Sequence, residues 1–371
     1  MHKVAITATG VLTPEHAISN HELVEAFNAY ADLQNAEHAA AIDAGDREPV
    51  PHSSAEFIVA ASGIESRYVW SKDGILDPAR MYPIYRERSD DEPSLMAEVG
   101  TAAGLIALER AGVDAADVDL LLCAASNMER AYPAMAVEIQ QELGTSGMAF
   151  DMNVACSSAT FGIQTAADMI RSGSVRKALV ISPEVTSGHL EWRDRDCHFI
   201  FGDVATAVLL ERAEDSTGGF EVVSTKCATQ FSNNIRNNNG FLRRTRNAME
   251  DRRDMQFMQN GRKVFKEVLP IVSSHIAAHM ADDDINAGDL KRLWLHQANK
   301  SMNDYIGKKV MGRTPEPSEQ PNILQDYANT SSAGSIIAFD KYSDDLASGE
   351  VGLICSFGAG YSVGSVIVRR R

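Results

Sequence analysis

The sequence predicts an α/β fold built from two similar halves. Short apolar runs alternate with stretches of helical periodicity from residue 4 to residue 182, a pattern typical of buried parallel strands joined by helical crossovers. The alternation begins again near Gly219, and no segment of low complexity separates the two series. At 371 residues the chain is longer than most single domains. We therefore expect an N-terminal half at residues 1–215 and a C-terminal half at residues 216–371.

In the first half, the strands are expected where Val, Ile, Leu and Ala gather without charge. The helix after the third strand has apolar residues at helical spacing from Phe161 to Ile170, and Gly173 ends it. The expected strands are 4–9, 120–125, 148–155 and 178–182.

In the second half, the uncharged run from Val351 to Val368 could be a membrane span or a pair of strands. Its 18 residues approach the length of a membrane span, but they contain four glycines flanked by β-branched residues, which favours strand, turn and strand. The other expected elements are a strand at 220–229, a helix at 263–280 and a strand at 293–295.

Composition excludes several functional classes. A net charge of −16 argues against nucleic acid as a partner. The five cysteines show no CxxC spacing, so neither a zinc site nor a disulfide framework is expected. The N-terminus has no signal-peptide pattern. We expect a cytoplasmic protein that does not bind membranes.

The charge is unevenly distributed. Residues 236–266 contain nine basic and three acidic side chains, so this segment carries +6 and the remainder −22. A solvated helical face would explain this, and so would docking of a strongly acidic partner.

Cys156, in the stretch NVACSSATFG at residues 153–162, lies where an expected strand ends and an expected helix begins. A thiol at such a junction faces unpaired backbone N–H groups and the positive end of the helix dipole, which favour the thiolate. From this stretch alone, a nucleophile and a buried structural cysteine are equal alternatives.

Two later stretches place polar side chains at similar junctions. His296 in LHQAN (295–299) follows an apolar strand, and Asn329 in NTSSAGS (329–335) precedes a run of small residues. The carboxyl ends of strands are where α/β sheets place their chemistry. Taken singly, a core histidine and an asparagine N-cap are the ordinary alternatives. Together with Cys156, the two residues favour an enzyme that acts on thioesters.

These three stretches and FGAGYSVG (357–364) resemble, in order, the four signatures of the β-ketoacyl-ACP synthase III family. FGD at 201–203 and the opening residues 4–23 add to the likeness, which covers most of the chain. The resemblance implies the thiolase fold, in which two duplicated α/β halves form five αβαβα layers. In detail the chain looks most like the medium-chain-primed β-ketodecanoyl-ACP synthase subgroup.

The resemblance also implies an activity, a decarboxylative Claisen condensation that makes 3-oxoacyl-ACP in fatty acid biosynthesis. Cys156 would take an octanoyl-like acyl group from acyl-CoA, and His296 and Asn329 would hold the enolate formed when malonyl-ACP loses carbon dioxide. The backbone N–H groups of Cys156 and Ala359 would form the oxyanion hole. The implied enzyme is a homodimeric acyltransferase without metal or cofactor. Acetyl-CoA as the primer remains an alternative.

The family's contacts to CoA and the carrier match less well. The matching positions are Phe57, Arg195, Phe265, Lys266, Ala298 and Asn299. Phe57 and Ala61 stand where the family usually has tryptophan and arginine, and Ser301 stands where a basic residue is common; Lys300 or the basic segment are possible substitutes. Tyr132 matches a position that reaches the partner's acyl pocket in family dimers, and a core tyrosine is its alternative.

Other functions of the same fold remain open. A degradative thiolase needs a second catalytic cysteine, but Cys355 lacks the glycines that should follow it, so we expect it to face the core. A head-to-head acyl-CoA condensing enzyme or a hydroxymethylglutaryl-type synthase needs a glutamate upstream of Cys156. Glu129 is the candidate, and we expect it to be solvated or paired with Arg130. A non-catalytic acyl-carrier-binding protein would not need all three polar groups.

Three segments look like insertions relative to shorter family members. They are residues 29–54, 71–89 and 230–254, which are polar and show little core-forming periodicity. We expect surface loops or lids there.

Overall fold

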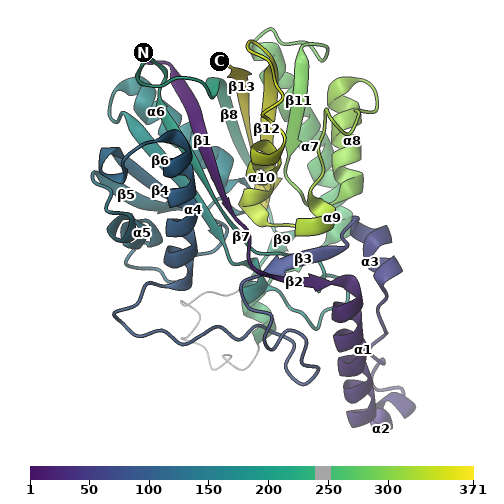
Figure 1. Cartoon of the computed structure of the whole chain (residues 1–371). Helices are drawn as coiled ribbons and strands as arrows, with labels where there is room; N and C mark the ends of the chain where they lie inside the picture. Colours follow the sequence, from purple (N-terminus) through teal and green to yellow (C-terminus); the bar gives the residue numbers. More distant parts are fainter. Residues whose placement is uncertain (239–251) are drawn as a thin grey trace.

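A computed structural model describes residues 1–238 and 252–371. Within them, nine strands form one mixed sheet in the order β11-β12-β13-β8-β1-β7-β6-β4-β5. β1 (Val4–Leu12) pairs with β7 (Val204–Arg212) along its whole length, but with β8 (Phe220–Ser232) only through Ala5 and Ile6. The sheet therefore has two parts that meet at a short bridge (Figure 1).

The two parts of the sheet come from different regions of the chain. The N-terminal part contains β1, β7, β4 (Leu120–Ala124), β5 (Met148–Met152) and β6 (Lys177–Glu184). The C-terminal part contains β8, β11 (Leu290–Leu295), β12 (Val351–Gly358) and β13 (Gly360–Arg370). The boundary at 215/216 falls between them, and we propose that residues 1–215 and 216–371 are the two duplicated halves.

The helices form three layers around the two parts of the sheet (Figure 1). α6 (Ser158–Ser172) and α10 (Gly334–Lys341) share one core cluster with strands of both parts. α4 (Leu95–Ala111) and α5 (Met135–Leu143) pack on the N-terminal part, and α7 (Gly261–Asp282) and α8 (Lys300–Met311) pack on the C-terminal part. This gives the five αβαβα layers of the expected thiolase fold.

Alternation along the strands explains why helices can cover both faces. In β4, Leu120 and Leu122 face the central helices, whereas Leu121 and Cys123 face α4 and α5. In β12, Ile354 faces the central layer and Cys355 faces the α7 side. The expected core position of Cys355 is thus confirmed, as is strand–turn–strand at 351–368. The strand expected at 148–155 ends earlier, at Met152.

A smaller unit lies below the sheet (Figure 1). It pairs β2 (His16–Ser19) with β3 (Ser66–Val69) and contains α1 (Asn20–Glu37), α2 (Ala39–Asp43) and α3 (Ala55–Ser62). α9 (Leu324–Tyr327) contributes Leu324 to its core.

The expectation of surface loops in the insertions is wrong in part. Residues 29–43 are mostly helical in α1 and α2, because Leu23, Ala26 and Phe27 anchor α1 to the core of this unit. The segment 71–89 has no helix or strand, but Ile75 and Met81 are fully buried.

In the third insertion, β8 extends to Ser232 and the short strands β9 (Ile235–Arg236) and β10 (Met258–Gln259) pair with each other. Residues 239–251, with Arg243, Arg244 and Arg246 of the basic segment, lie outside the described residues. In the described part of the chain, no helix combines the length and apolar character needed to cross a membrane.

Candidate active site

Cys156 lies in a short 3₁₀ turn (Ala155–Ser157) between β5 and α6. The turn begins with Ala155 at a φ of +48°, an unusual conformation for a residue other than glycine. Asn153 Oδ1 accepts the Ala155 N–H at 3.0 Å, and Ser158 Oγ accepts the Val154 N–H at 2.9 Å. These side chains hold the turn that directs the thiol away from the helix.

The turn between β12 and β13 covers the thiol from the other half. A Cβ placed on Gly358 would lie 2.6 Å from Cys156 Cβ and 2.9 Å from its Sγ, so only glycine fits this approach without displacement. The backbone N–H groups of Ala359 and Cys156 act on the sulfur and favour its charged form. They are the two donors expected for the oxyanion hole.

Burial dominates the electrostatics of Cys156. Desolvation raises the pKa of its thiol to about 11, although the Ser331 hydroxyl and the two backbone N–H groups oppose this. The Glu184 carboxylate adds to the increase.

His296 follows β11, and its backbone N–H donates to Cys355 O at 2.7 Å. The imidazole packs edge-on against the ring of Phe357, with 5.2 Å between centroids, and the residue is 2% exposed. Burial lowers the pKa of His296 to about 4. The imidazole is therefore neutral at pH 7, and it can donate one N–H without carrying charge.

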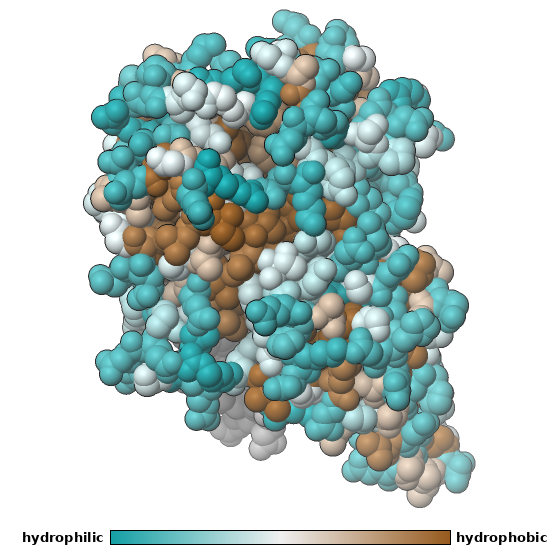
Figure 2. Space-filling model, viewed as in Figure 1, coloured by the Kyte–Doolittle hydropathy of each residue, from teal (hydrophilic) through white to brown (hydrophobic). Residues whose placement is uncertain are grey.

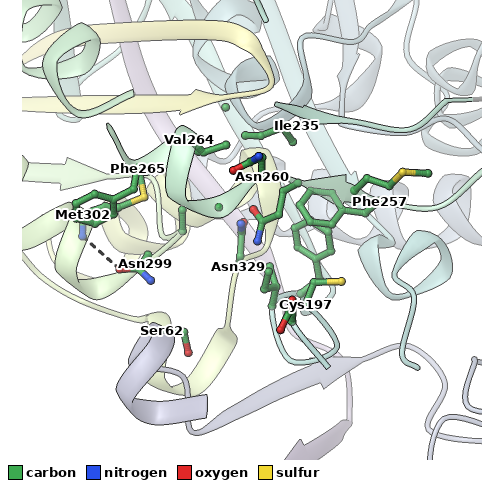
Figure 3. Close-up of a pocket in the computed structure, with 18 of the residues that line it drawn as sticks. Ser62, Cys197, Ile235, Phe257, Asn260, Val264, Phe265, Asn299, Met302 and Asn329 are labelled. Carbon is green, nitrogen blue, oxygen red and sulfur yellow. Dashed lines mark hydrogen bonds between the residues drawn. The ribbon is translucent and has the colours of Figure 1, made fainter. Parts of the chain in front are cut away.

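Asn329 is placed by backbone pairing with the segment 200–202. Its N–H donates to Ile200 O at 2.9 Å, and its carbonyl accepts the Gly202 N–H at 3.2 Å. Its side-chain Oδ1 accepts the Ser331 N–H at 2.9 Å. The other end of the amide, Nδ2, is left to donate toward the cavity, where Figure 3 shows this side chain.

Cys156, His296 and Asn329 line one cavity of about 1060 Å³. Its walls come from both halves and from the third insertion (Figure 3). The main apolar wall residues are Phe199, Phe201, Phe257, Val264, Phe265 and Met302. Phe257, just after the third insertion, packs on Phe201 with 4.7 Å between ring centroids, and its N–H donates to His189 O at 2.9 Å, so this segment completes the wall.

Of the residues expected to contact CoA and the carrier, Phe57, Phe265, Ala298 and Asn299 line this cavity. Arg195 does not line it, but its guanidinium stacks on the Phe57 ring at 4.0 Å. Lys266 is exposed on α7. Lys300, suggested as a substitute cation, pairs with Asp304 at 2.7 Å. The structure thus brings four of these six residues into the cavity.

Tyr132 and Glu129 lie outside the cavity. Tyr132 is 83% exposed, so it is not a core tyrosine. Glu129 accepts the Met96 N–H at the start of α4, at 3.0 Å. Glu129 is exposed, which confirms the expectation of a solvated side chain; the alternative, pairing with Arg130, is not observed, because Arg130 bonds Glu138 instead.

Sequence reasoning missed Glu184, a fully buried carboxyl at the end of β6. It accepts hydrogen bonds from the backbone N–H and hydroxyl of Ser126, and from the same two groups of Ser332. Burial raises the pKa of this carboxyl. Glu184 thereby connects the loop beside Cys156 to the turn after Asn329. The available signal was a glutamate at the end of a largely apolar strand. A carboxyl in that place is buried only when it has partners.

Two segments of the chain match the same protein family. The family described as "3-Oxoacyl-[acyl-carrier-protein (ACP)] synthase III" matches residues 150–230, and its "C terminal" counterpart matches residues 280–370. The first match contains Cys156, and the second contains His296 and Asn329.

Individual proteins are similar over much greater lengths. The Beta-ketodecanoyl-[acyl-carrier-protein] synthase of Pseudomonas aeruginosa is 54% identical over 349 residues, 94% of this chain and 100% of the relative. The Beta-ketoacyl-[acyl-carrier-protein] synthase III of Acidiphilium cryptum is 36% identical, over 73% of this chain and 83% of that protein. Among solved structures, the priming β-ketosynthase of the R1128 polyketide pathway superposes with a TM-score of 0.78 at 24% identity, covering 99% and 96% of the two chains, which shows a shared fold.

Proposed function

Since the chain belongs to the 3-oxoacyl-[acyl-carrier-protein] synthase III family, we propose that it condenses an octanoyl-like acyl-CoA with malonyl-ACP to 3-oxodecanoyl-ACP. The observation that carries this proposal is the meeting of Cys156, His296 and Asn329 in one cavity. The 54% identity with a β-ketodecanoyl synthase supports the medium-chain primer.

In the first stage, Cys156 Sγ attacks the thioester carbonyl of acyl-CoA. A new C–S bond forms, the bond to CoA breaks, and the proton lost by the thiol ends on the sulfur of the released CoA. The Cys156 and Ala359 N–H groups stabilise the oxyanion of the tetrahedral intermediate. A missing donor of this kind typically costs about 3–4 kcal/mol of barrier stabilisation.

In the second stage, malonyl-ACP loses carbon dioxide and the electron pair moves into an enolate. The neutral His296 imidazole and the Asn329 amide donate hydrogen bonds to the enolate oxygen. The carbanion then attacks the Cys156 thioester, the bond to Cys156 breaks, and the thiolate takes up a proton. His296 suits this role because burial keeps it uncharged at pH 7.

The apolar walls of the cavity and the stacked pair of Phe57 and Arg195 fit an acyl-CoA, with the aromatic ring and guanidinium offering a surface for the adenine. Arg262 lines the cavity, and Lys263 and Lys266 are exposed beside it in sequence on the first turns of α7. They offer an acidic carrier protein a positively charged surface.

The proposal includes a homodimer. β5 is an edge strand of the sheet, and exposed edges are sites for pairing with another chain. Neighbouring elements leave apolar side chains exposed, with Leu105 at 52%, Val137 at 44% and Met148 at 46%. In the same view as Figure 1, Figure 2 shows hydrophobic side chains gathered across the middle of the molecule and toward the side on which α4 and α5 lie. Tyr132, 83% exposed, would reach the partner's acyl pocket. A reducing cytoplasm suits the free thiols.

Covalent labelling tests the assignment. Intact-protein mass spectrometry after incubation with octanoyl-CoA should show an octanoyl adduct on the native protein and none on Cys156→Ser. Cys227→Ser, a half-buried thiol in β8, is the matched control and should be labelled like the native protein. Normal turnover by the Cys156→Ser variant would contradict the mechanism.

A further inference from the structure

The Cys156 thiolate needs hydrogen-bond donors beyond the backbone N–H groups of Cys156 and Ala359. Burial raises the pKa of this thiol to about 11, and the nearby Glu184 carboxylate disfavours the thiolate further. His296, which lines the same cavity, is uncharged at pH 7 because burial lowers its pKa to about 4. The imidazole therefore does not supply a cation, and neutral donors must stabilise the sulfur.

Ser331 has the position for this task. It begins the 3₁₀ turn Ser331–Ala333, which packs against the 3₁₀ turn that carries Cys156. Ser331 is 2% exposed, and within the described residues its buried hydroxyl has no hydrogen-bond partner. A buried hydroxyl without a partner is costly, and this hydroxyl lowers the pKa of the Cys156 thiol on the facing turn.

The backbone of Ser331 is also unusual. Ser331 has a φ of +51°, a conformation that non-glycine residues rarely adopt. It is held there because the Ser331 N–H donates to Asn329 Oδ1 at 2.9 Å. Such unusual backbone conformations persist where the surrounding structure imposes them, and they cluster at active sites. The same contact therefore fixes the Asn329 amide and the Ser331 backbone.

We propose that Ser331 is a further catalytic residue, whose hydroxyl donates a hydrogen bond to the Cys156 thiolate. The bond stabilises the sulfur twice, as the nucleophile before acylation and as the leaving group when the carbanion displaces it. Ser331 transfers no proton and keeps its own O–H throughout. The inference rests on the proposed function for its place in the reaction, but thiol reactivity tests it without any acyl-CoA.

Thr330 provides a matched control next to Ser331. It is fully buried, and its hydroxyl also has no hydrogen-bond partner. It is not among the groups that act on the Cys156 sulfur. Thr330→Val removes this hydroxyl and keeps the shape.

The experiment is the pH dependence of iodoacetamide alkylation at Cys156, followed by mass spectrometry of its peptide. For Ser331→Ala, the midpoint should rise by about 1–2 pH units and alkylation at pH 7.5 should slow roughly 10- to 100-fold, because a hydrogen bond to a charged group is lost. The alkylation rates of Ser331→Ala and the native protein should converge at high pH, where both thiols are ionised. A variant in which the thiol is displaced would remain slower at every pH. Thr330→Val should retain the native profile.

Coincident profiles for Ser331→Ala and the native protein would overturn the proposal, as would an equal shift in Thr330→Val. If Ser331→Ala does not fold, Ser331→Gly replaces it, since glycine adopts a positive φ without strain. A native protein that no acyl-CoA labels, but whose alkylation still depends on Ser331, would refute the proposed function and leave this inference standing.

Discussion

The turn that carries Cys156 and the turn that follows Asn329 have nearly the same backbone but different chemistry. Each starts with a non-glycine residue at positive φ, Ala155 at +48° and Ser331 at +51°, and continues through a 3₁₀ turn into a central helix, α6 or α10. The second residue of the first turn is Cys156. In the second turn it is Ser332, whose hydroxyl and N–H bond Glu184.

This difference shows how one local structure can serve two roles. In the N-terminal half, the turn presents a reactive sulfur to the cavity. In the C-terminal half, the turn is tied through Glu184 to the loop at Ser126, and in the proposed mechanism Asn329, before this turn, and Ser331, its first residue, stabilise charge. The proposal therefore takes the nucleophile from one half and most of the groups that stabilise charge from the other.

The largest expected effect separates the two stages of the reaction. His296→Ala should still form the acyl-enzyme, because the Cys156 turn and the contact between Asn329 and Ser331 are both intact. Its discharge by malonyl-ACP should slow on the order of 10²–10³-fold, because an enolate donor is lost. Rapid-quench mass spectrometry of adduct formation and decay measures both stages, with exposed His16→Ala as the control. Equal slowing of adduct formation and adduct discharge would contradict the separate roles proposed for the two halves.

A second change breaks the connection between the two turns. Glu184→Ala should lower the free energy of unfolding by about 2–4 kcal/mol, because buried N–H groups of Ser126 and Ser332 lose their acceptor. Glu184→Gln should lower the free energy of unfolding by less, because glutamine keeps the side-chain volume and one hydrogen-bond acceptor. In addition, burial already disfavours the charged carboxylate at this position. Urea denaturation measures both, with exposed Glu142→Ala as the control. An unchanged stability in Glu184→Ala would contradict the proposed connection.

The smallest expected effect concerns pH. His279 on α7 is 2% exposed, its Nδ1 bonds Ser365 Oγ at 2.6 Å, and burial lowers its pKa to about 4. A depressed histidine pKa contributes stability that is present above pH 6.5 and lost as the pH falls through about 4.

His279 should therefore add a slope of up to about 1.4 kcal/mol per pH unit to the stability in this range. His279→Gln should remove that slope. Urea denaturation between pH 7 and pH 4.5 measures it, and parallel curves for the two proteins would contradict the assignment. His189, His198 and His296 shift in the same direction, so the native protein should lose stability steeply in acid.

The sequence predicted the features that depend on local patterns. Strand and helix periodicity predicted the alternating elements, and Gly173 ends α6 at a φ of +84° as expected. The three polar residues could be placed at junctions because each follows or precedes an apolar run. α1 was partly missed, because its buried residues contact a core formed by distant segments.

The missed parts of the site depend on contacts across the two halves. Glu184 has partners 58 and 148 residues away, so no local pattern identifies them. Ser331 has a positive φ, which a serine in a run of small residues does not predict. Ile75 and Met81 are buried without periodicity, because irregular chain covers the core there.

The most direct test of the account is a primer series read by intact-protein mass spectrometry. The native protein is incubated with acetyl-, butyryl-, octanoyl- and decanoyl-CoA in turn, and each adduct is then exposed to malonyl-ACP. The account predicts that an octanoyl adduct on Cys156 predominates and is discharged to 3-oxodecanoyl-ACP. Labelling by acetyl-CoA alone, or an octanoyl adduct that malonyl-ACP does not discharge, would contradict it.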